Sequence, residues 1–597
     1  MQKTKMVFTI GPASDSEEIL SELIKAGMSA SRHNFSHGTH EEHKVRIDLI
    51  RRLSDKFNKN IATILDTKGP EIRTGDFKDK TVELKEGNKF TIYCGEEILG
   101  DETKCYITYD NLHNDVKKGD TILIDDGLVA LEVESVEGNK VHCMVKNSGI
   151  VSNHKGVNVP GVDVSLPSLT EKDRADLKFG CEVGVDFIAA SFIRKGSDVL
   201  EIRKVLEENG GTDIQIFSKI ENQQGVENID EIIKFSDGIM VARGDMGVEL
   251  QMEQVPIIQK MIIEKCNKAG KPVITATQML DSMIRNPRPT RAEVSDVANA
   301  IFDGTDAVML SGETAGGKYP IESAKAMANI ARAAEETMNY DEIFNKKRET
   351  RVLSVANAIS IATCTTASEL NASAILTATQ TGYTARAVSK YRPACPIIAI
   401  TPNKSVARKL ALSWGVFPIL TTEFTSTDAL IENSVEIALK AEYITKGDLV
   451  VIAAGIPVSY SGTTNMLKVH VVGDILVQGR GSGNNTGYGI AKVVNSPEEA
   501  ERVVESGDIL VVKDADIDYV SVLNRVSGVI SERGGLTSHL AIECISNEIP
   551  FICGAGGATD VLKSGYFITM DVKRGIVYNG RVTIWFYDKY NKKYINF

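Results

Sequence analysis

The segment IQIFSKIENQQGVENIDEIIKFSDGIMVARGD, residues 214–245, contains two short apolar runs separated by a stretch with helical patterning. The runs IQIFSKI and GIMVA are short, are bounded by polar residues and are rich in β-branched side chains, which indicates buried strands. Lys219 lies near the end of the first run and Glu221 directly follows it. Asp245 lies three residues after the second run. A strand, a helix and a second strand in succession predict a βαβ unit within a parallel sheet.

The same alternation extends over the first 340 residues. Eight short apolar runs are each a candidate buried strand, and helical patterns follow most of them: KMVFTIG, SASRHNF, IATILDT, VDFIAASF, IQIFSKIE, GIMVARGD, PVITATQM and DAVMLSGE. Eight βα units predict an α/β fold of the (β/α)8 barrel type.

Changes in residue composition and hydrophobic pattern indicate further domains along the chain. After ILDTKGPEIR the sequence has Gly-Asp and Asn-Gly turns between alternating strands, which predicts a small all-β insertion in the third unit. Another α/β pattern begins near residue 354, and a Gly-rich polar stretch near residue 480 is typical of a linker. We therefore predict a barrel domain (1–70 and 167–340), an inserted all-β domain (71–166), a second α/β domain (341–472), a linker (473–489) and an extra α/β domain (490–597).

The composition narrows the class of protein. The 597 residues include 42% hydrophobic and 25% charged residues, with a net charge of −12. An acidic chain is a poor general partner for nucleic acid or an anionic membrane, so neither is expected. The nine cysteines are dispersed without a Cys-x-x-Cys pair, and no secretory signal is recognised at the start. Reduced thiols of this kind are typical of a cytoplasmic protein.

The predicted barrel strands end in polar side chains. In barrels of this type, the carboxyl ends of the strands meet at one rim, where catalytic residues lie. The convergence of six such strand ends favours a catalytic site over ordinary strand termini. The residues are Arg32, Asn34, Ser36 and His37; Asp66, Thr67 and Lys68; Lys219, Glu221 and Asn222; Arg243, Gly244 and Asp245; Thr275 and Thr277; and Ser311, Gly312 and Glu313.

The residue types at this rim indicate a chemistry. Glu221 and Asp245 offer hard carboxylate oxygens without a His or Cys partner, which suits Mg²⁺ or Mn²⁺ rather than zinc. Arg32, Arg73 and Lys219 are cations suited to phosphate. A divalent metal with arginine and lysine is typical of phosphoryl transfer. A set of mostly neutral oxygens around one carboxylate could hold a monovalent cation: Asn34, Ser36, Asp66 and Thr67.

The histidines of residues 33–43 suggest a metal cluster at first sight. The stretch THEE, residues 39–42, matches a capping box, so these histidines span a loop and the start of a helix. We predict that His33 points away from the ligand-bearing face and that His40 and His43 face solvent.

Several longer motifs resemble those of pyruvate kinases: TIGPAS, RHNFSHG, LDTKGPEIRTG, SKIEN, MVARGDMGVE, ATQMLDSM and NPRPTRAEVSDVANAIFDGTDAVMLSGETA. The resemblance extends from the start of the chain to about residue 470. It implies a barrel, an inserted β-barrel lid domain and a regulatory C-terminal domain, usually assembled as a homotetramer. It also implies that phosphoenolpyruvate and ADP are converted to pyruvate and ATP.

The resemblance assigns roles to individual positions. Arg32, Lys219 and Thr277 are implied as catalytic residues, and Arg32, Lys219, Gly244, Asp245 and Thr277 as substrate contacts. Glu71 is implied to accompany K⁺ dependence, because a lysine at this place can replace the ion, and Ser311 and Glu313 are implied to belong to a water network that protonates the enolate. The remaining positions are the Mg²⁺ ligands Glu221 and Asp245, the K⁺ ligands Asn34, Ser36, Asp66 and Thr67, and the nucleotide contacts Asn34, His37, Arg73 and Lys155. The sequence departs from the family at His33, where an apolar residue is usual.

Two further stretches resemble known sites. TATQTGYTARAV resembles the loop that binds a phosphorylated effector, with candidate residues Thr379, Thr381, Gly382 and Thr384, and SYSGTTN (459–465) is its candidate second wall. The stretch around RGGLTSHLAI (533–542) resembles the mobile phosphohistidine domain of phosphoenolpyruvate-utilising enzymes, and His539 falls on its phosphorylated position.

Three interpretations follow from these resemblances. The chain is a pyruvate kinase with an appended domain, a dikinase-type enzyme phosphorylated at His539, or an inactive ligand-sensing relative. The second lacks a recognisable nucleotide-grasp domain, and the third conflicts with a site in which every charged position is filled. The sequence does not identify the effector.

Overall fold

A computed structural model describes residues 1–349, 353–422, 427–456, 463–482, 486–582, 585–588 and 593–596. One compact unit comprises Met1–Ile361, Thr379–Glu423 and Ser461–Thr463, and the other comprises Ala362–Ala378, Phe424–Tyr460 and Thr464–Phe597. The first unit contains the barrel, the insertion and part of the following α/β region.

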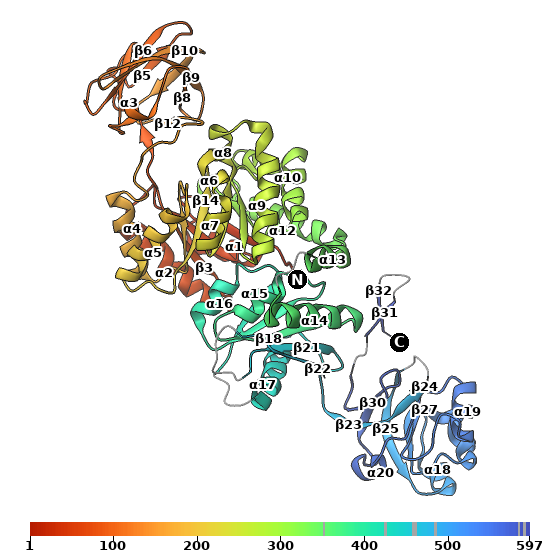
Figure 1. Ribbon diagram of the computed structural model, residues 1–597. Coiled ribbons are helices and arrows are strands. Elements are labelled where there is room, and N and C mark those ends of the chain that lie inside the picture. Colours follow the sequence, from red (N-terminus) through yellow and green to blue (C-terminus); the bar gives the residue numbers. More distant parts are fainter. Residues whose placement is uncertain are drawn as a thin grey trace. The chain divides into compact units, whose positions relative to one another are not determined.

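A closed barrel of eight parallel strands forms the centre of the first unit, in the order β1-β17-β16-β15-β14-β13-β3-β2 (Figure 1). All eight predicted runs are confirmed as strands of this barrel. Their bounds are β1 (Lys5–Thr9), β2 (Ala30–Asn34), β3 (Ala62–Asp66), β13 (Phe187–Ala190), β14 (Gln215–Ile220), β15 (Gly238–Ala242), β16 (Val273–Ala276) and β17 (Ala307–Leu310).

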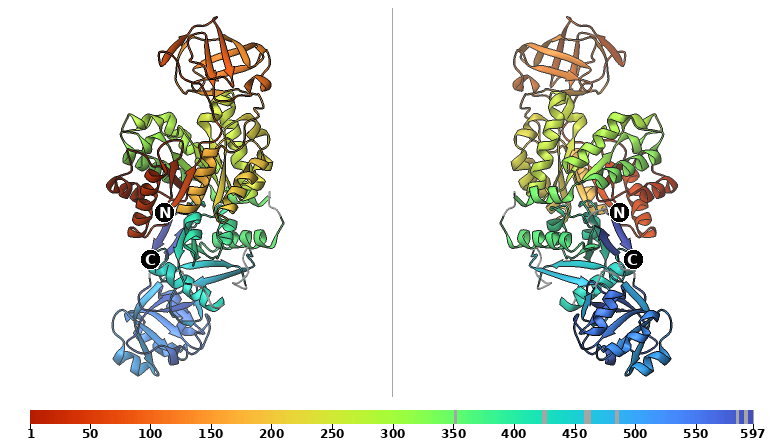
Figure 2. Two further views of the ribbon diagram at one scale, coloured as in Figure 1. Left: turned by 90° about the vertical axis from the view of Figure 1, so that its left-hand side faces the viewer. Right: turned by 90° about the vertical axis from the view of Figure 1, so that its right-hand side faces the viewer.

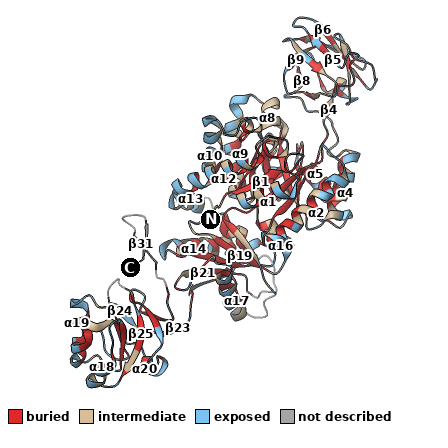
Figure 3. Ribbon diagram, turned by 180° about the vertical axis from the view of Figure 1, so that it is seen from behind, coloured by how far each residue is buried: buried red, intermediate tan, exposed pale blue. Residues whose placement is uncertain are grey.

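Helices surround these strands, which are buried almost throughout their length (Figure 3). Burial on both faces explains the continuous apolar runs, because side chains of both alternating sets must avoid water. The helices are α1 (Glu17–Ala26), α2 (His40–Lys56), α4 (Glu171–Val183), α5 (Gly196–Glu208), α6 (Gln223–Glu227), α7 (Ile229–Phe235), α8 (Arg243–Glu249), α9 (Val255–Ala269), α10 (Arg291–Asp303), α11 (Gly312–Ala315), α12 (Pro320–Thr337) and α13 (Tyr340–Glu349), with 3₁₀ turns η1 (Met252–Gln254) and η2 (Asp281–Ile284).

The insertion between β3 and α4 is an all-β structure, shown in orange in Figure 2. Seven of its strands follow the order β4-β12-β8-β9-β10-β6-β7, and a bridge between Thr74 and Ile107 joins the two edges. This closure removes the exposed sheet edges. The elements are β4 (Ile72–Arg73), β5 (Thr81–Leu84), β6 (Lys89–Cys94), β7 (Lys104–Ile107), α3 (Leu112–Asp115), β8 (Thr121–Ile124), β9 (Val129–Glu137), β10 (Lys140–Val145), β11 (Gly149–Ser152) and β12 (Gly156–Asn158).

An α/β region follows the barrel. Strand β19 pairs in parallel with β20, while β18 pairs in parallel with β21, which in turn pairs antiparallel with β22. The elements are α14 (Val355–Glu369), β18 (Ala374–Ala378), α15 (Tyr383–Ser389), β19 (Ile397–Thr401), α16 (Lys404–Leu410), β20 (Val416–Leu420), α17 (Thr427–Lys440), β21 (Leu449–Ala454) and β22 (Met466–Val471).

The last part of the chain forms an eight-stranded sheet in the order β23-β30-β29-β25-β26-β27-β28-β24. A separate pair, β31–β32, follows it. The elements are β23 (Ile475–Gln478), β24 (Arg480–Ser482), β25 (Thr486–Val494), α18 (Pro497–Val503), β26 (Asp508–Val512), η3 (Ile517–Arg525), β27 (Val526–Ser531), α19 (His539–Ser546), β28 (Phe551–Cys553), α20 (Ala558–Val561), β29 (Phe567–Asp571), β30 (Ile576–Asn579), β31 (Trp585–Asp588) and β32 (Lys593–Asn596).

The prediction of a linker at residues 473–489 is wrong, because this stretch contains β23, β24 and the start of β25, which pair within the sheet. Four of its glycines, Gly479, Gly481, Gly487 and Gly489, lie where a Cβ atom would clash with neighbouring backbone. A Cβ atom at Gly481 would lie only 1.7 Å from the carbonyl oxygen of Val572. Glycine inside a strand often marks such an approach, and from sequence alone it resembles linker composition.

The capping box at the start of α2 is confirmed, with reciprocal hydrogen bonds between Thr39 and Glu42. The prediction that His43 faces solvent is wrong, since its side chain is buried and its ring stacks on Phe35. His40 is only partly exposed, and its Nε2 atom lies 2.7 Å from Oδ1 of Asp176. Contact between α2 and α4 covers this face of the helix, which capping alone does not predict.

Candidate active site

A buried lysine lies near the end of strand β14, between the carboxylate of Asp66 at the end of β3 and that of Glu221, which directly follows β14. The Nζ atom of Lys219 lies 3.1 Å from Oδ1 of Asp66 and 3.0 Å from Oε1 of Glu221, and it donates to Oγ of Ser191 at 2.7 Å. These contacts join the ends of β3, β13 and β14. Three predicted site residues are therefore brought into direct contact.

Arg32 extends this charged network to two more strands. Its Nε atom pairs with Oδ2 of Asp66 at 2.5 Å, and its Nη1 atom donates to the Thr9 hydroxyl at 3.0 Å. Arg32 comes from β2, and Thr9 ends β1. The two cations thus bind opposite oxygens of one carboxylate, which fixes the orientation of Asp66.

The charges of this network shift the proton affinities of its members. Burial alone would lower the pKa of Lys219, but the carboxylates of Asp66 and Glu221 outweigh it and hold that pKa above its ordinary value. Burial opposes ionisation of Asp66 as well, yet Arg32 and Lys219 lower its pKa overall. Burial raises the pKa of Glu221 to about 7, and the nearby charge of Asp245 adds to this rise.

Gly244 and Thr277 form a second group at the same rim. The Gly244 amide donates to the Thr277 hydroxyl at 2.7 Å, and Arg243 donates to the Thr277 carbonyl at 2.8 Å. Thr277 has a φ of 67°, in a region that β-branched residues rarely adopt. Arg243 is in turn held by Asp296 at 2.7 Å. Such strain persists only where surrounding contacts enforce it, and it is concentrated at functional sites.

Glu313 organises the end of β17. Its two carboxylate oxygens accept hydrogen bonds from the amides of Ser311 and Leu280 at 2.7 and 3.0 Å. The Ser311 hydroxyl is buried without a hydrogen-bond partner among the described residues. A buried polar atom of this kind commonly binds water or a ligand, as the predicted water network requires.

The candidate K⁺ ligands lie at and just after the ends of the adjacent strands β2 and β3, and they are partly engaged with protein atoms. The Asn34 side-chain oxygen accepts from the Ser36 amide at 3.1 Å, and the Thr67 hydroxyl accepts from the Ser191 amide at 3.1 Å. Neither contact uses all the lone pairs of these oxygens. The set therefore fits a monovalent cation, with Asp66 as its single carboxylate.

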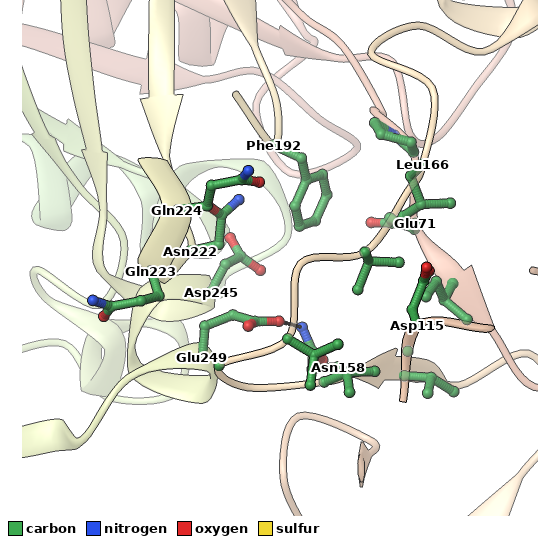
Figure 4. Close-up of a pocket in the computed structure, with 18 of the residues that line it drawn as sticks. Glu71, Asp115, Asn158, Leu166, Phe192, Asn222, Gln223, Gln224, Asp245 and Glu249 are labelled. Atoms are coloured by element: carbon green, nitrogen blue, oxygen red, sulfur yellow. Dashed lines mark hydrogen bonds between the residues drawn. The ribbon is translucent and has the colours of Figure 1, made fainter. Parts of the chain in front are cut away.

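A cavity of about 650 Å³ lies between the barrel rim and the inserted domain (Figure 4). Asp245 and Glu249 line one side, and Glu71 and Asp115 line the other, while Glu249 accepts a hydrogen bond from Asn158 at 2.7 Å. The cavity is large enough for a nucleotide-sized ligand.

The candidate nucleotide contacts differ in their placement. Arg73 and Lys155 line this cavity. Arg73 is held by Glu71 at 2.7 Å, and Lys155 pairs with Asp125 at 2.9 Å, so both cations are positioned by carboxylates. His37 is an exposed loop residue outside the cavity lining.

The residues that the sequence analysis missed come from the two strand ends left out of its list. Thr9 ends β1, and Ser191 and Phe192 follow β13. The Ser191 hydroxyl accepts from Lys219 and donates to the carbonyl of Thr67 at 2.6 Å, and the Phe192 amide donates to Glu221 at 2.6 Å. The strand-end rule that found the other residues would have identified these as well.

The candidate effector loop and His539 belong to parts of the chain that follow the barrel. The Thr379 hydroxyl accepts from the Gly382 amide at 2.9 Å, which places Gly382, with a φ of 80°, before α15. Thr384 is buried and Thr381 is exposed, while residues 459–462 of the candidate second wall lie outside the described residues. His539 is the exposed first residue of α19, which Ser538 caps.

The acidic residues at the rim fit a divalent cation held partly by substrate. In the described part of the chain, no cluster of three or more His, Cys, Asp or Glu side chains is arranged to hold a metal. Glu221 and Asp245 supply two carboxylates, and their mutual repulsion contributes to the raised pKa of Glu221. Mg²⁺ commonly binds one or two carboxylates and completes its shell with water and phosphate.

Comparisons with known families match three parts of the chain. The pyruvate kinase barrel domain matches residues 1–324, the pyruvate kinase alpha/beta domain matches 357–470, and the mobile domain of PEP-utilising enzymes matches 504–575. The chain belongs to the pyruvate kinase family. The predicted fold class, a barrel with an inserted domain, an α/β domain and an extra domain, is confirmed.

Individual pyruvate kinases cover the chain to different extents. That of Sporosarcina psychrophila is 51% identical and covers 98% of this chain and all of its own length. That of Clostridium acetobutylicum is 65% identical over 472 residues, 79% of this chain and all of its own length. A crystal structure of a pyruvate kinase from Cryptosporidium parvum has a TM-score of 0.76 and 40% identity, covering 79% of this chain and 96% of that one.

These relatives identify the chain as an enzyme of the pyruvate kinase family. They also distinguish its parts, because the Clostridium relative matches with its whole length and leaves about a fifth of this chain without a counterpart. In the described residues, no helix is both long and apolar enough to cross a membrane.

We predict that Ser191→Ala lowers kcat about tenfold, the effect of one lost hydrogen bond to a charged group. The substitution removes the hydroxyl that orients Lys219 but leaves both carboxylate contacts. Steady-state kinetics at saturating substrate would measure the change.

Ser218→Ala is the matched control, because Ser218 is a buried β14 serine whose hydroxyl contacts Ser236 instead. Equal turnover of the two variants would show that Ser191 does not position Lys219.

Proposed function

We propose that this chain transfers the phosphoryl group of phosphoenolpyruvate to ADP, giving pyruvate and ATP. The contact of Lys219 with Asp66 and Glu221, beside Arg32, carries the proposal, because it places two cations next to a carboxylate suited to a divalent metal, Glu221, and one suited to K⁺, Asp66. Family membership supports the same reaction. The bond between phosphorus and the enol oxygen breaks, and a terminal oxygen of ADP forms a new bond to phosphorus.

We propose Glu221 and Asp245 as ligands of Mg²⁺ or Mn²⁺, and Asn34, Ser36, Asp66 and Thr67 as ligands of K⁺. When bound, these ions supply positive charge that offsets the charge of the phosphate oxygens. The protein contributes a dry, preorganised site in which such interactions are stronger than in water.

The chain's own residues then have separable tasks. Arg32 and Lys219 contact the phosphoryl group and stabilise the charge that develops on its oxygens. Gly244 and Thr277 contact the substrate directly, and the Asp245 carboxylate contacts it through the divalent cation that it would hold. The enolate receives its proton at the methylene carbon from water held near Ser311 and Glu313.

ADP is proposed to occupy the 650 Å³ cavity with Arg73 and Lys155 as its phosphate contacts. Asn34, at the end of β2, and His37, in the loop after it, are proposed to contact the nucleotide from outside the cavity lining. The inserted domain supplies part of the cavity wall, so it can exclude water from the reacting groups.

We further propose a glycolytic role, a cytoplasmic location, a homotetramer and regulation by a phosphorylated small molecule. The effector contacts would be Thr379, Thr381, Gly382 and Thr384, since hydroxyls and amides before a helix suit a phosphate. The likeness of these parts to the pyruvate kinase alpha/beta domain supports the assignment.

The competing function is dikinase chemistry through a phosphorylated His539, favoured by the match to the mobile domain of PEP-utilising enzymes. One assay separates the two functions. Pyruvate release from phosphoenolpyruvate should require ADP and should fail with AMP and pyrophosphate, whereas dependence on the latter pair would favour the dikinase. Failure with both pairs would favour an inactive, ligand-sensing relative.

We predict that Lys219→Met reduces kcat by at least about 10²-fold, because one preorganised charge contact to the transferred group is lost. Single-turnover measurement of ATP formation would test this. Lys5→Met is the control, since Lys5 is equally buried at the start of β1 and its ammonium group donates to the carbonyl of Val416. Comparable rates for both folded variants would remove Lys219 from the catalytic residues.

We predict that activity depends on K⁺ and that Glu71→Lys makes the ion partly dispensable. Glu71 accepts from Arg73 and lies near Lys68, so an ammonium group here adds positive charge beside the proposed K⁺ ligands. Activity would be titrated with KCl. Glu71→Gln is the control, because it removes the carboxylate without supplying an ammonium; overlapping curves for all three proteins would contradict the prediction.

We predict that His539→Ala, and deletion of residues 473–597, leave pyruvate formation within about twofold of the full chain, because direct transfer to ADP needs no carrier. The Clostridium relative, which spans only 472 aligned residues, supports this. Turnover of folded protein measures it, and collapse of turnover in His539→Ala would refute it. Labelled phosphoenolpyruvate with detection of acid-labile label on His539 tests a side reaction independently.

A further inference from the structure

A second cavity, of about 190 Å³, lies at the opposite end of the barrel from the catalytic rim. Phe187 and Gln215 line it at the starts of β13 and β14, and Lys271 lies just before β16. Arg386 of α15 and Lys409 of α16 form another part of its wall. The volume corresponds to about six molecules of liquid water, which is enough for a small oxyanion and its hydration.

Three cations converge on this cavity, and none of them is neutralised by a salt bridge within the described residues. Lys271 donates to the carbonyls of Ile233, Lys234 and Ser236 at 2.5 to 2.9 Å. Lys409 donates to the carbonyl of Asp213 at 2.5 Å. Carbonyl groups orient an ammonium but do not cancel its charge.

Arg386 is held in the same way, by the carbonyl of Thr381 at 3.2 Å. The one carboxylate that lines this cavity, Asp237, is engaged by Arg203 at 2.6 Å. The cavity therefore carries excess positive charge at a place sheltered from bulk water.

The electrostatic cost of this arrangement is visible in the lowered pKa values of two of these cations, Lys409 and Arg386. Burial lowers the pKa of Lys409, and the positive charges of Arg408 and Arg386 lower it further despite two nearby aspartates. Burial also lowers the pKa of Arg386. A bound anion would offset the repulsion and the desolvation together.

Arg386 also connects the cavity with the effector loop. Its guanidinium donates to Thr381 of that loop, and Gly382 packs so closely that a Cβ atom there would lie 2.6 Å from Nη1 of Arg386. A ligand that binds this guanidinium from the cavity side would thus affect the conformation of the effector loop without binding to the loop itself.

We propose that this cavity is a binding site for a small phosphate-class dianion, held by Lys271, Arg386 and Lys409. The site is distinct from the catalytic rim and from the effector loop, and its existence does not depend on the proposed reaction. Occupancy ties the starts of the barrel strands to α15 and α16 through charge-assisted hydrogen bonds.

The test is isothermal titration of the full chain with inorganic phosphate, at fixed ionic strength, in the absence of substrates. Lys409→Gln should weaken the binding about tenfold, as expected for one charge-assisted hydrogen bond. Lys404→Gln is the matched control, because Lys404 lies on the same helix but pairs with Asp55 away from the cavity. Thr381→Val reports on phosphate bound at the effector loop instead.

Loss of affinity in Lys409→Gln alone supports the proposal. Loss in Thr381→Val with normal binding in Lys409→Gln overturns it in favour of the effector loop, and equal binding by all variants, or no binding by the unmodified chain, also overturns it. Should Lys409→Gln fold poorly, Lys409→Arg provides the second arm, since it keeps the charge and is expected to bind phosphate within about threefold of the unmodified chain.

Discussion

The barrel rim depends on one requirement, that the buried charge of Lys219 be balanced. A charged lysine with only 9% of its residue surface exposed is strongly destabilising unless opposite charges lie against it. Asp66 and Glu221 meet that need, and Asp66 also balances Arg32. Removing one partner of such a pair commonly costs about 3–5 kcal/mol, because the other charge remains buried. The network thus imposes both stability and geometry on the rim.

That requirement also explains why the site uses several strands. Each strand of a parallel barrel delivers only its last residues to the rim, so a balanced set of charges must be assembled from different strands. Arg32, Asp66 and Lys219 come from β2, β3 and β14, and Ser191 follows β13 between the last two. The inserted domain after β3 then places a second wall beside them, and the cavity between the two can enclose a substrate.

Much of this organisation can be predicted from sequence because it is encoded locally. Buried parallel strands appear as apolar runs, and their ends appear as polar residues, so the barrel and most rim residues can be predicted from the sequence. Contacts between elements that are distant in the sequence cannot be predicted in this way. The burial of His43 depends on packing against Phe35, and the role of Ser191 depends on the reach of Lys219 from the next strand. The role of glycine could not be predicted either, because Gly481 permits close strand packing although the composition around it resembles that of a linker.

The extra domain illustrates how a complete site limits the interpretation of a motif. Its sheet has its own buried core, formed by residues such as Leu510, Val529 and Phe551, so it needs no side chain from the barrel to fold. His539 begins a short helix and is exposed, a placement that suits a carrier and equally suits an inert surface residue. Chemistry decides between these roles, because a carrier is useful only where donor and acceptor cannot meet. If phosphoryl transfer takes place directly at the barrel rim, as proposed, donor and acceptor meet in one site and that reaction leaves no step for the histidine.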